Sequence, residues 1–322
     1  MDPLVTSTHT IDFTDQIFRV EFSPYEWSQN IICIALANKI AVGNVKFQEE
    51  DDDLEDELEF QLLKEFHHET RVSALAWSPE TSLSVLPKCL SFASAGADYK
   101  LRLFTSDLVA SHTLQVLCGH TNYVNCVTYD PEGQFLASVS DDHKCKLWNI
   151  KEDNSCTATF FLTSPGMAVC FHQEAAGKLL VAEKNGVIHL YNVLSHQAIL
   201  SVDSGSIPLM SADWSSSNSL YVAAIAAGEL LVWDISRPSL PIDARPVHVE
   251  GGQLLRFSQL SDQYIATVGQ ADLQLKVTCI KSKQPALTAS LQLVGGLTWH
   301  FRLPYVCVGN DRKLCFWKVA TK

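Results

Sequence analysis

Residues 119–149, GHTNYVNCVTYDPEGQFLASVSDDHKCKLWN, contain the clearest local signals of how this chain folds. It holds an alternating apolar run that ends in Tyr129 and the polar turn Asp130-Pro131, and a later strand-like run that contains Trp148. Both features return at regular intervals along the 322 residues. Self-similarity at a fixed period is typical of repeat architectures, so these two landmarks bear on the whole chain.

The first landmark is an aromatic residue that ends an apolar run and precedes a polar turn. It occurs at Phe22, Trp77, Tyr129, Phe171, Trp214, Phe257 and Trp299. Successive positions are 55, 52, 42, 43, 43 and 42 residues apart. A period of this size predicts four short strands per repeat, which is typical of propeller blades.

The second landmark lies in the predicted third strand of each repeat. It occurs at Phe104, Trp148, Tyr191, Trp233 and Trp317, with a degenerate copy near Val277. An Asp or Asn stands six residues earlier in four copies, at Asp98, Asp142, Asn185 and Asp311. Because both landmarks give the same period, the sequence predicts one all-β domain over residues 1–322, a seven-bladed propeller.

The third repeat carries the fullest signature. Its Gly119-His120, Ser140, Asp142 and Trp148-Asn149 resemble the Gly-His and Trp-Asp pattern of WD repeats. The resemblance implies that His120, Ser140, Asp142 and Trp148 form a buried hydrogen-bonded network, in which the acceptors of the turn Asp are satisfied. A catalytic triad is a poorer interpretation, since no nucleophile elbow or oxyanion hole accompanies these residues.

The end of the chain predicts how the ring closes. Five residues follow Trp317, too few for a turn and an outer strand of about 5–6 residues. Residues 6–13 precede the first repeat and can supply the missing strand. We therefore expect an N-terminal strand to complete the seventh blade and remove two open sheet edges.

Composition excludes several classes of protein. The net charge is −12, and nine acidic residues lie within 49–59, so phosphate backbones should repel the chain and no direct nucleic-acid partner is expected. No apolar run is long enough for a membrane helix, and the N-terminus lacks the features of a secretory signal. The ten cysteines include no Cys-x-x-Cys pair, which favours reduced thiols.

Two insertions interrupt the period, an acidic one at about 48–60 in blade 1 and a loop at about 80–90 in blade 2. The acidic insertion has two interpretations. It is either a solvated hairpin tip, or a short acidic helix on which Leu54, Leu58 and Leu62 align toward a basic partner. No phosphate loop, dinucleotide motif or convincing metal-ligand set is present, so we predict no cofactor and no enzymatic activity.

Several longer segments of the sequence extend the resemblance. They include FHHETRVSALAWSPET at 66–81, SVSDDHKCKLWN at 138–149, VAEKNG at 181–186 and GLTWH at 296–300. Over about 47–317 the chain resembles the vertebrate thirty-seven-kilodalton WD-repeat nucleoporin family, which belongs to the Y-shaped outer-ring complex of the nuclear pore.

That resemblance implies a function and partners that composition and spacing do not. It implies a non-catalytic scaffold that supports pore assembly and the transport of protein and mRNA, located at the nuclear envelope and, in mitosis, at kinetochores. It implies binding to the large propeller-plus-helical nucleoporin and other subunits of the complex. The alternative is a substrate receptor of a cullin ubiquitin ligase. Such receptors resemble one another in a Trp-Asp-x-Arg motif, and residues 233–237 (WDISR) differ from this motif by one extra residue before the arginine.

Overall fold

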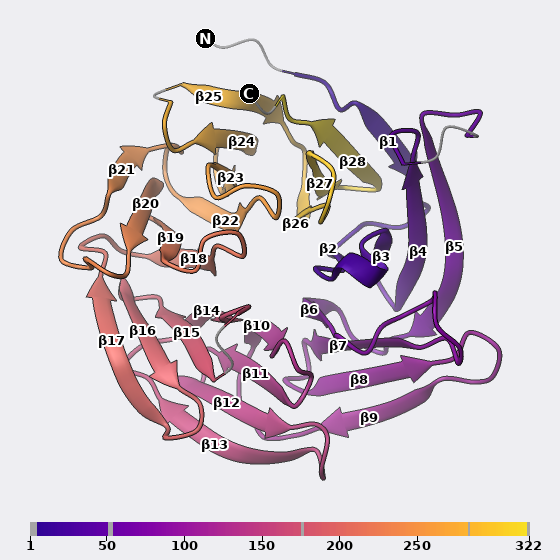
Figure 1. Cartoon of the computed structure of the whole chain (residues 1–322), viewed down its shortest axis with the longest axis horizontal. Helices are drawn as coiled ribbons and strands as arrows, with labels where there is room; N and C mark the ends of the chain where they lie inside the picture. The colour runs from indigo at the N-terminus through magenta and orange to yellow at the C-terminus, as the bar shows by residue number, and fades with distance from the viewer. Residues whose placement is uncertain (1–4, 51–53, 175–176, 283, 321–322) are drawn as a thin grey trace.

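The computed structural model describes residues 5–50, 54–174, 177–282 and 284–320. Figure 1 shows a ring of blades around a central axis, and each blade is a sheet of four antiparallel strands. There are seven such sheets in the described parts of the chain. The predicted all-β, seven-bladed WD-repeat propeller is confirmed.

The first four blades follow the sequence from the axis outward. Blade 1 contains β2 (Arg19–Phe22), β3 (Ile31–Ala35), β4 (Lys39–Phe47) and β5 (Leu58–His67), with the short helix η1 (Glu26–Ser28) after β2. Blade 2 contains β6 (Val72–Trp77), β7 (Leu90–Gly96), β8 (Leu101–Ser106) and β9 (Thr113–Leu117). Blade 3 contains β10 (Val124–Tyr129), β11 (Phe135–Ser140), β12 (Lys144–Asn149) and β13 (Ser155–Phe161). Blade 4 contains β14 (Gly166–Phe171), β15 (Lys178–Glu183), β16 (Val187–Asn192) and β17 (Gln197–Asp203).

The last three blades repeat the plan until the final strand. Blade 5 contains β18 (Leu209–Trp214), β19 (Tyr221–Ala226), β20 (Glu229–Asp234) and β21 (Asp243–Pro246). Blade 6 contains β22 (Gly252–Phe257), β23 (Tyr264–Gly269), β24 (Gln274–Cys279) and β25 (Pro285–Ser290). Blade 7 contains β26 (Val294–Trp299), β27 (Tyr305–Asn310), β28 (Lys313–Lys318) and, from the other end of the chain, β1 (His9–Asp12).

The recurring aromatic residue ends the innermost strand of every blade, and there it is buried. Two of the tryptophans also bond the neighbouring blade. The indole Nε1–H of Trp77 donates to the carbonyl oxygen of Glu21 at 2.9 Å, and that of Trp299 donates to Arg256 at 3.1 Å. A buried indole needs an acceptor for its N–H group, and here the acceptor joins one blade to the next.

The hydrophobic core is divided among the spaces between blades. One cluster joins Phe22, Ile34 and Phe47 of blade 1 to Tyr305 and Phe316 of blade 7. Similar clusters lie between the other neighbouring blades, so each blade in the ring buries apolar side chains on both of its faces. A single blade exposes those faces, and the ring is the arrangement that covers all of them.

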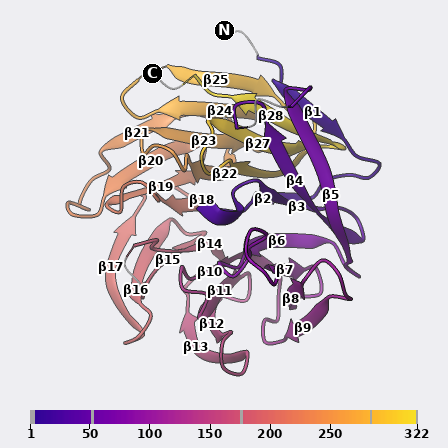
Figure 2. The same cartoon turned by 45° about the vertical axis from the view of Figure 1, so that its right-hand side comes forward.

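Closure uses the predicted N-terminal segment. Strand β1 pairs antiparallel with β28, from His9 opposite Phe316 to Asp12 opposite Lys313, and Figure 2 shows the two strands side by side. The backbone N–H of Phe13 continues the contact by donating to Arg312 at 2.8 Å. The prediction of an N-terminal closing strand is confirmed, and the strand lies within the predicted residues 6–13.

Removal of residues 1–13 should open the seventh blade. We expect the melting temperature to fall by well over ten degrees or the protein to aggregate, because β28 becomes an exposed edge and the core between blades 7 and 1 loses Ile11. The measurement is thermal unfolding with light scattering on the truncated and the full chain. A truncated chain that is as soluble and as stable as the full chain would contradict the importance of closure.

Candidate functional site

The polar network of blade 3 joins four side chains. The imidazole of His120 contacts Asp142 through Nδ1 at 2.9 Å and Ser138 through Nε2 at 2.8 Å. The indole Nε1 of Trp148 contacts the same Ser138 hydroxyl at 3.0 Å. The ionised carboxylate of Asp142 can only accept, so the neutral His120 imidazole carries its proton on Nδ1 and donates it to Asp142. His120 Nε2 then accepts from the Ser138 hydroxyl, which itself accepts from the indole N–H of Trp148.

The serine that joins His120 to Trp148 is Ser138, whereas the predicted Ser140 is connected to the network through Asp142. Both residues lie on β11 and, being two apart, on the same face of the sheet. Ser140 instead accepts the backbone N–H of Asp142 at 3.0 Å and donates to the carbonyl of Asn122 at 3.1 Å. It therefore holds the turn that presents Asp142, one step away from the histidine.

Burial and hydrogen bonds set the charge states of the network. Burial lowers the pKa of His120 despite the opposing effect of Asp142. For Asp142 burial acts to raise the pKa, but the hydrogen bonds from Thr121 and His120 outweigh it and hold the pKa below its usual value. A neutral histidine beside an ionised aspartate matches the donor pattern above. Ser138 has no exposed surface, so the arrangement stabilises the blade and offers no nucleophile to a substrate.

Related networks occur in two other blades. In blade 6, His248 Nδ1 contacts Asp272 and His248 Nε2 contacts Thr267, both at 2.9 Å. In blade 2, His68 Nε2 contacts Ser94 at 3.0 Å. Sequence analysis missed the blade 6 network because its third strand lacks the tryptophan that marks the pattern. The sequence did contain one signal: His248 precedes Asp272 by 24 residues, which is close to the 22 residues between His120 and Asp142 in blade 3.

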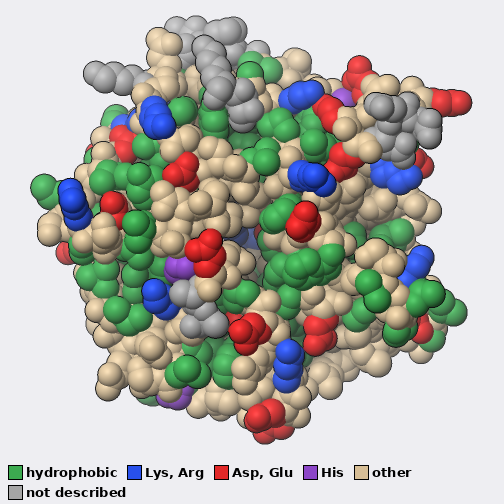
Figure 3. Space-filling model, viewed as in Figure 1, with side chains coloured by type: hydrophobic (Ala, Val, Ile, Leu, Met, Phe, Trp, Pro, Cys, Tyr) green, Lys and Arg blue, Asp and Glu red, His purple; other side chains and the backbone are tan. Residues whose placement is uncertain are grey.

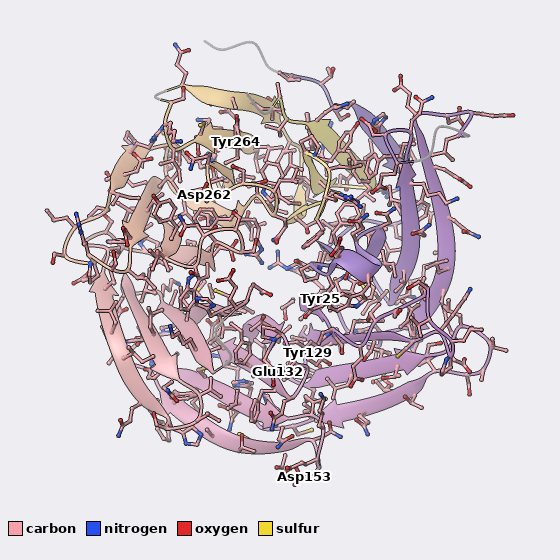
Figure 4. All side chains as sticks on the ribbon, in the orientation of Figure 1. Tyr25, Tyr129, Glu132, Asp153, Asp262 and Tyr264 are labelled. Carbon is pink, nitrogen blue, oxygen red and sulfur yellow. The ribbon has the colours of Figure 1, made fainter. Side chains whose placement is uncertain are left out.

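The axis of the ring holds a second group of charged residues. The innermost strands of all seven blades line a cavity of about 210 Å³, and Glu21 and Arg256 line both it and a further cavity of about 120 Å³. Figure 4 shows Tyr25 and Tyr129, which line the second cavity, close to the axis. Asp213 completes the group by accepting the backbone N–H of Phe257 at 2.8 Å.

The charges in the channel depend on one another. Burial raises the pKa of Glu21 to about 7, with Asp213 adding to the effect and Arg256 and Arg19 opposing it. Burial also raises the pKa of Asp213, again against Arg256. For Arg256 burial acts to lower the pKa, but the two carboxylates outweigh it and raise the pKa. The channel is thus a partly compensated charge cluster, which sequence reasoning missed because its members are up to 237 residues apart.

The acidic run of blade 1 lies at the hairpin between β4 and β5, and residues 51–53 fall outside the described part. The helix interpretation is wrong, because Leu58 pairs with Phe47 in the sheet and Leu62 also lies on β5. Leu58 packs against the core between blades 1 and 7, while Leu54 is half-buried beside the turn. A spacing of four residues places side chains on one face of a helix but also on one face of a strand.

The base of this hairpin is bonded to the closing blade. Glu49 accepts from the hydroxyl of Tyr305 at 2.9 Å and from the ammonium of Lys318 at 2.5 Å. Glu50 accepts from the amides of Gln29 and Asn30 at 3.0 and 2.8 Å. Through Glu49, the start of the acidic run therefore contributes to the contact between blades 1 and 7.

The described ranges, 5–50, 54–174, 177–282 and 284–320, lack two further kinds of feature. No group of three or more His, Cys, Asp or Glu side chains there is arranged to hold a metal ion. No helix in those ranges is long and apolar enough to span a membrane.

Replacing Asp142 by Ala should destabilise the protein by about 1–3 kcal/mol, because His120 and the backbone N–H of Thr121 lose their buried acceptor. The measurement is urea unfolding at neutral pH. The control is Asp56→Ala at the exposed hairpin, which should change stability by less than about 0.5 kcal/mol. Equal effects of the two substitutions would contradict a stabilising role for the network.

Replacing Glu21 by Gln should stabilise the protein by about 3 kcal/mol at pH 8 but by only about 1 kcal/mol at pH 5. The folded-state pKa of about 7 lies above the usual glutamate pKa of 4.5, so the wild-type protein loses stability as the pH rises through this interval. The glutamine variant has no carboxylate to ionise and therefore does not lose this stability. The stability difference between variant and wild type is measured by thermal unfolding at both pH values, with the exposed Glu55→Gln as control. A stability gain that is the same at both pH values would contradict the raised pKa of Glu21.

Comparisons with known proteins agree with the architecture. The family model for the WD domain, G-beta repeat, matches residues 60–105 and 111–149. Nucleoporin Nup37 of Homo sapiens is 44% identical over 317 residues, which cover 97% of this chain and 96% of that protein. The Mus musculus protein of the same name is 44% identical over 322 residues, covering 98% of each chain.

A more distant relative has the same extent. Nucleoporin Nup37 of Drosophila melanogaster is 39% identical over 326 residues and covers the whole of both chains. The similarity therefore extends along the whole chain, and it confirms the family predicted from the sequence. The chain belongs to the Nup37 nucleoporin family.

Proposed function

We propose that this chain is a non-catalytic scaffold and interaction subunit of the outer ring of the nuclear pore, and that it supports pore assembly and nucleocytoplasmic transport. The observation that carries the proposal is the similarity to nucleoporins along the whole length of the chain. A nuclear location at the nuclear envelope follows from the same relationship. A second location at kinetochores in mitosis is proposed from the sequence resemblance alone.

The geometry suits a scaffold. The histidine and serine groups that resemble catalytic residues are buried and bonded to one another, and the charged residues of the channel compensate one another. A closed ring fixes its surface loops in relative position, so little conformational freedom is lost when a partner binds. The proposed partners are the large propeller-plus-helical nucleoporin and other subunits of the Y-shaped complex.

The contact should depend chiefly on folded strands and turns, with the acidic hairpin secondary. Stable complexes bury roughly 1,200–2,000 Å² around apolar and aromatic anchors. Exposed carboxylates supply mostly screened charge, which raises the rate of association more than the affinity. Half-buried Leu54 and Leu58 are weak anchor candidates, since Leu58 already packs against the core.

The proposal is tested by purifying the tagged chain from cells and identifying the proteins that accompany it. Recovery of outer-ring nucleoporins is the expected result. Recovery of a cullin ligase in their place would contradict the proposal and favour the alternative function.

A second test uses the chain and the large nucleoporin as a purified pair. Changing residues 51–56 from Asp to Asn and from Glu to Gln should weaken binding less than about tenfold and flatten its salt dependence. Titrations at low and at physiological ionic strength measure both effects. The control is Glu132→Gln, an acidic residue of another blade, and loss of all binding in the hairpin variant would show that the hairpin is the anchor.

A further inference from the structure

Blade 2 has the most exposed group of apolar side chains for which the proposed function gives no role. Val109 in the β8–β9 turn is 93% exposed, and Leu86 and Val85 in the β6–β7 loop are 82% and 65% exposed. Leu114 and Val116 on β9 are each 46% exposed. Figure 3 shows hydrophobic side chains gathered at the right-hand edge, where the β8–β9 turn lies in Figure 1.

Every blade ends in an outer strand whose outer edge has no strand partner among the described residues. Such an edge pairs readily with another chain unless a charge, a proline, a bulge or a very short strand prevents it. Strand β5 has a bulge and charged residues, and β13, β17 and β25 have bulges. Strands β1 and β21 have four residues each, and β21 ends in a proline.

Strand β9 has none of these protections. Its five residues, TLQVL, include no charge and no proline. Its ladder with β8 runs through five consecutive pairs, from Thr105 with Thr113 to Leu101 with Leu117, with no shift in register. Four of its five residues are exposed. Among the outer strands of the described chain, β9 alone presents a regular, uncharged edge.

Hydrogen bonds fix the backbone of the turn that leads into β9, although the tip of the turn is apolar. Asp107 Oδ1 accepts the backbone N–H groups of Val109 and Ala110 at 2.9 and 2.8 Å. The ammonium of Lys64 on blade 1 donates to the carbonyl of Ala110 at 2.7 Å. Leu108 packs into the core between blades 1 and 2. The turn therefore holds Val109 in solvent in a fixed place, as a preformed binding surface does.

From these features we infer that the edge of β9 binds an extended, uncharged and largely apolar segment of a partner protein, which adds to blade 2 as a fifth strand. The edge offers unpaired backbone groups to such a strand, and Leu114 and Val116, two residues apart, offer one apolar face to its side chains. Five residues bury less than the roughly 800 Å² per partner of a stable complex, and exposed Val109, in the turn that leads into β9, offers a further apolar contact.

A second copy of this chain is a poor occupant. Each copy carries a net charge of −12, and two copies joined edge to edge would repel one another. The inference rests on the proposed function only in requiring that the chain works within a protein assembly.

The experiment compares hydrogen exchange of the full chain alone and in the assembly that co-purifies with it. Amides of Thr113–Leu117 should exchange at least about tenfold more slowly in the assembly, as newly paired strand amides do. Amides of the bulged edge strand β17 (Gln197–Asp203) serve as the control and should not change. Equal exchange of β9 in both states would overturn the inference, and protection in a dimeric free chain would make a second copy the occupant.

Matched substitutions give an independent readout. The double variant Leu114→Lys and Val116→Lys should reduce the co-purifying partner about tenfold, corresponding to about 1.4 kcal/mol. Ile199→Lys, at an equally exposed site on β17, should leave recovery unchanged. Circular dichroism melting of both variants verifies that they are folded, and undiminished recovery by a folded double variant would overturn the inference.

The outcomes separate this inference from the proposed function. Recovery of nucleoporins without protection of β9 would leave the function standing and reject the edge as the binding surface. Protection of β9 by a protein from outside the pore would support the edge as the binding surface and contradict the proposed function.

Discussion

Burial of both faces of every blade is the constraint on which the whole structure depends. A four-stranded sheet with apolar side chains on two faces is not stable alone, so each blade requires a neighbour on either side. The pairing of β1 with β28 supplies the last neighbour and joins the two ends of the chain. The aromatic residue at the end of each innermost strand and the tryptophan bonds between blades are consequences of the same requirement.

Polar groups inside the ring follow a related rule, because a buried donor or acceptor without a partner is costly. The His120 network satisfies its members with one another inside one blade. The channel compensates charge across blades, since Glu21, Asp213 and Arg256 come from three different innermost strands. Both sets of contacts stabilise the ring.

The sequence predicted the fold well because its signals are local and repeated. An aromatic residue at a fixed period needs no knowledge of tertiary contacts, and the shortage of residues after Trp317 indicated the closing strand. The serine that joins His120 to Trp148 was not identified because Ser138 and Ser140 share a face, so only the position of the histidine in space distinguishes them. The channel residues and the open edge of β9 were beyond sequence reasoning, because both depend on register and on which blades meet.

Closure by the first strand also has a consequence for synthesis. Strand β1 precedes every other strand in the sequence, and its partner β28 follows all of them. At about 5–20 residues per second, ~300 residues separate the emergence of the two strands by roughly 15–60 s. During that interval the nascent chain carries an unpaired strand and an uncovered face on blade 1. The final circular state is therefore reached only after translation of the last blade.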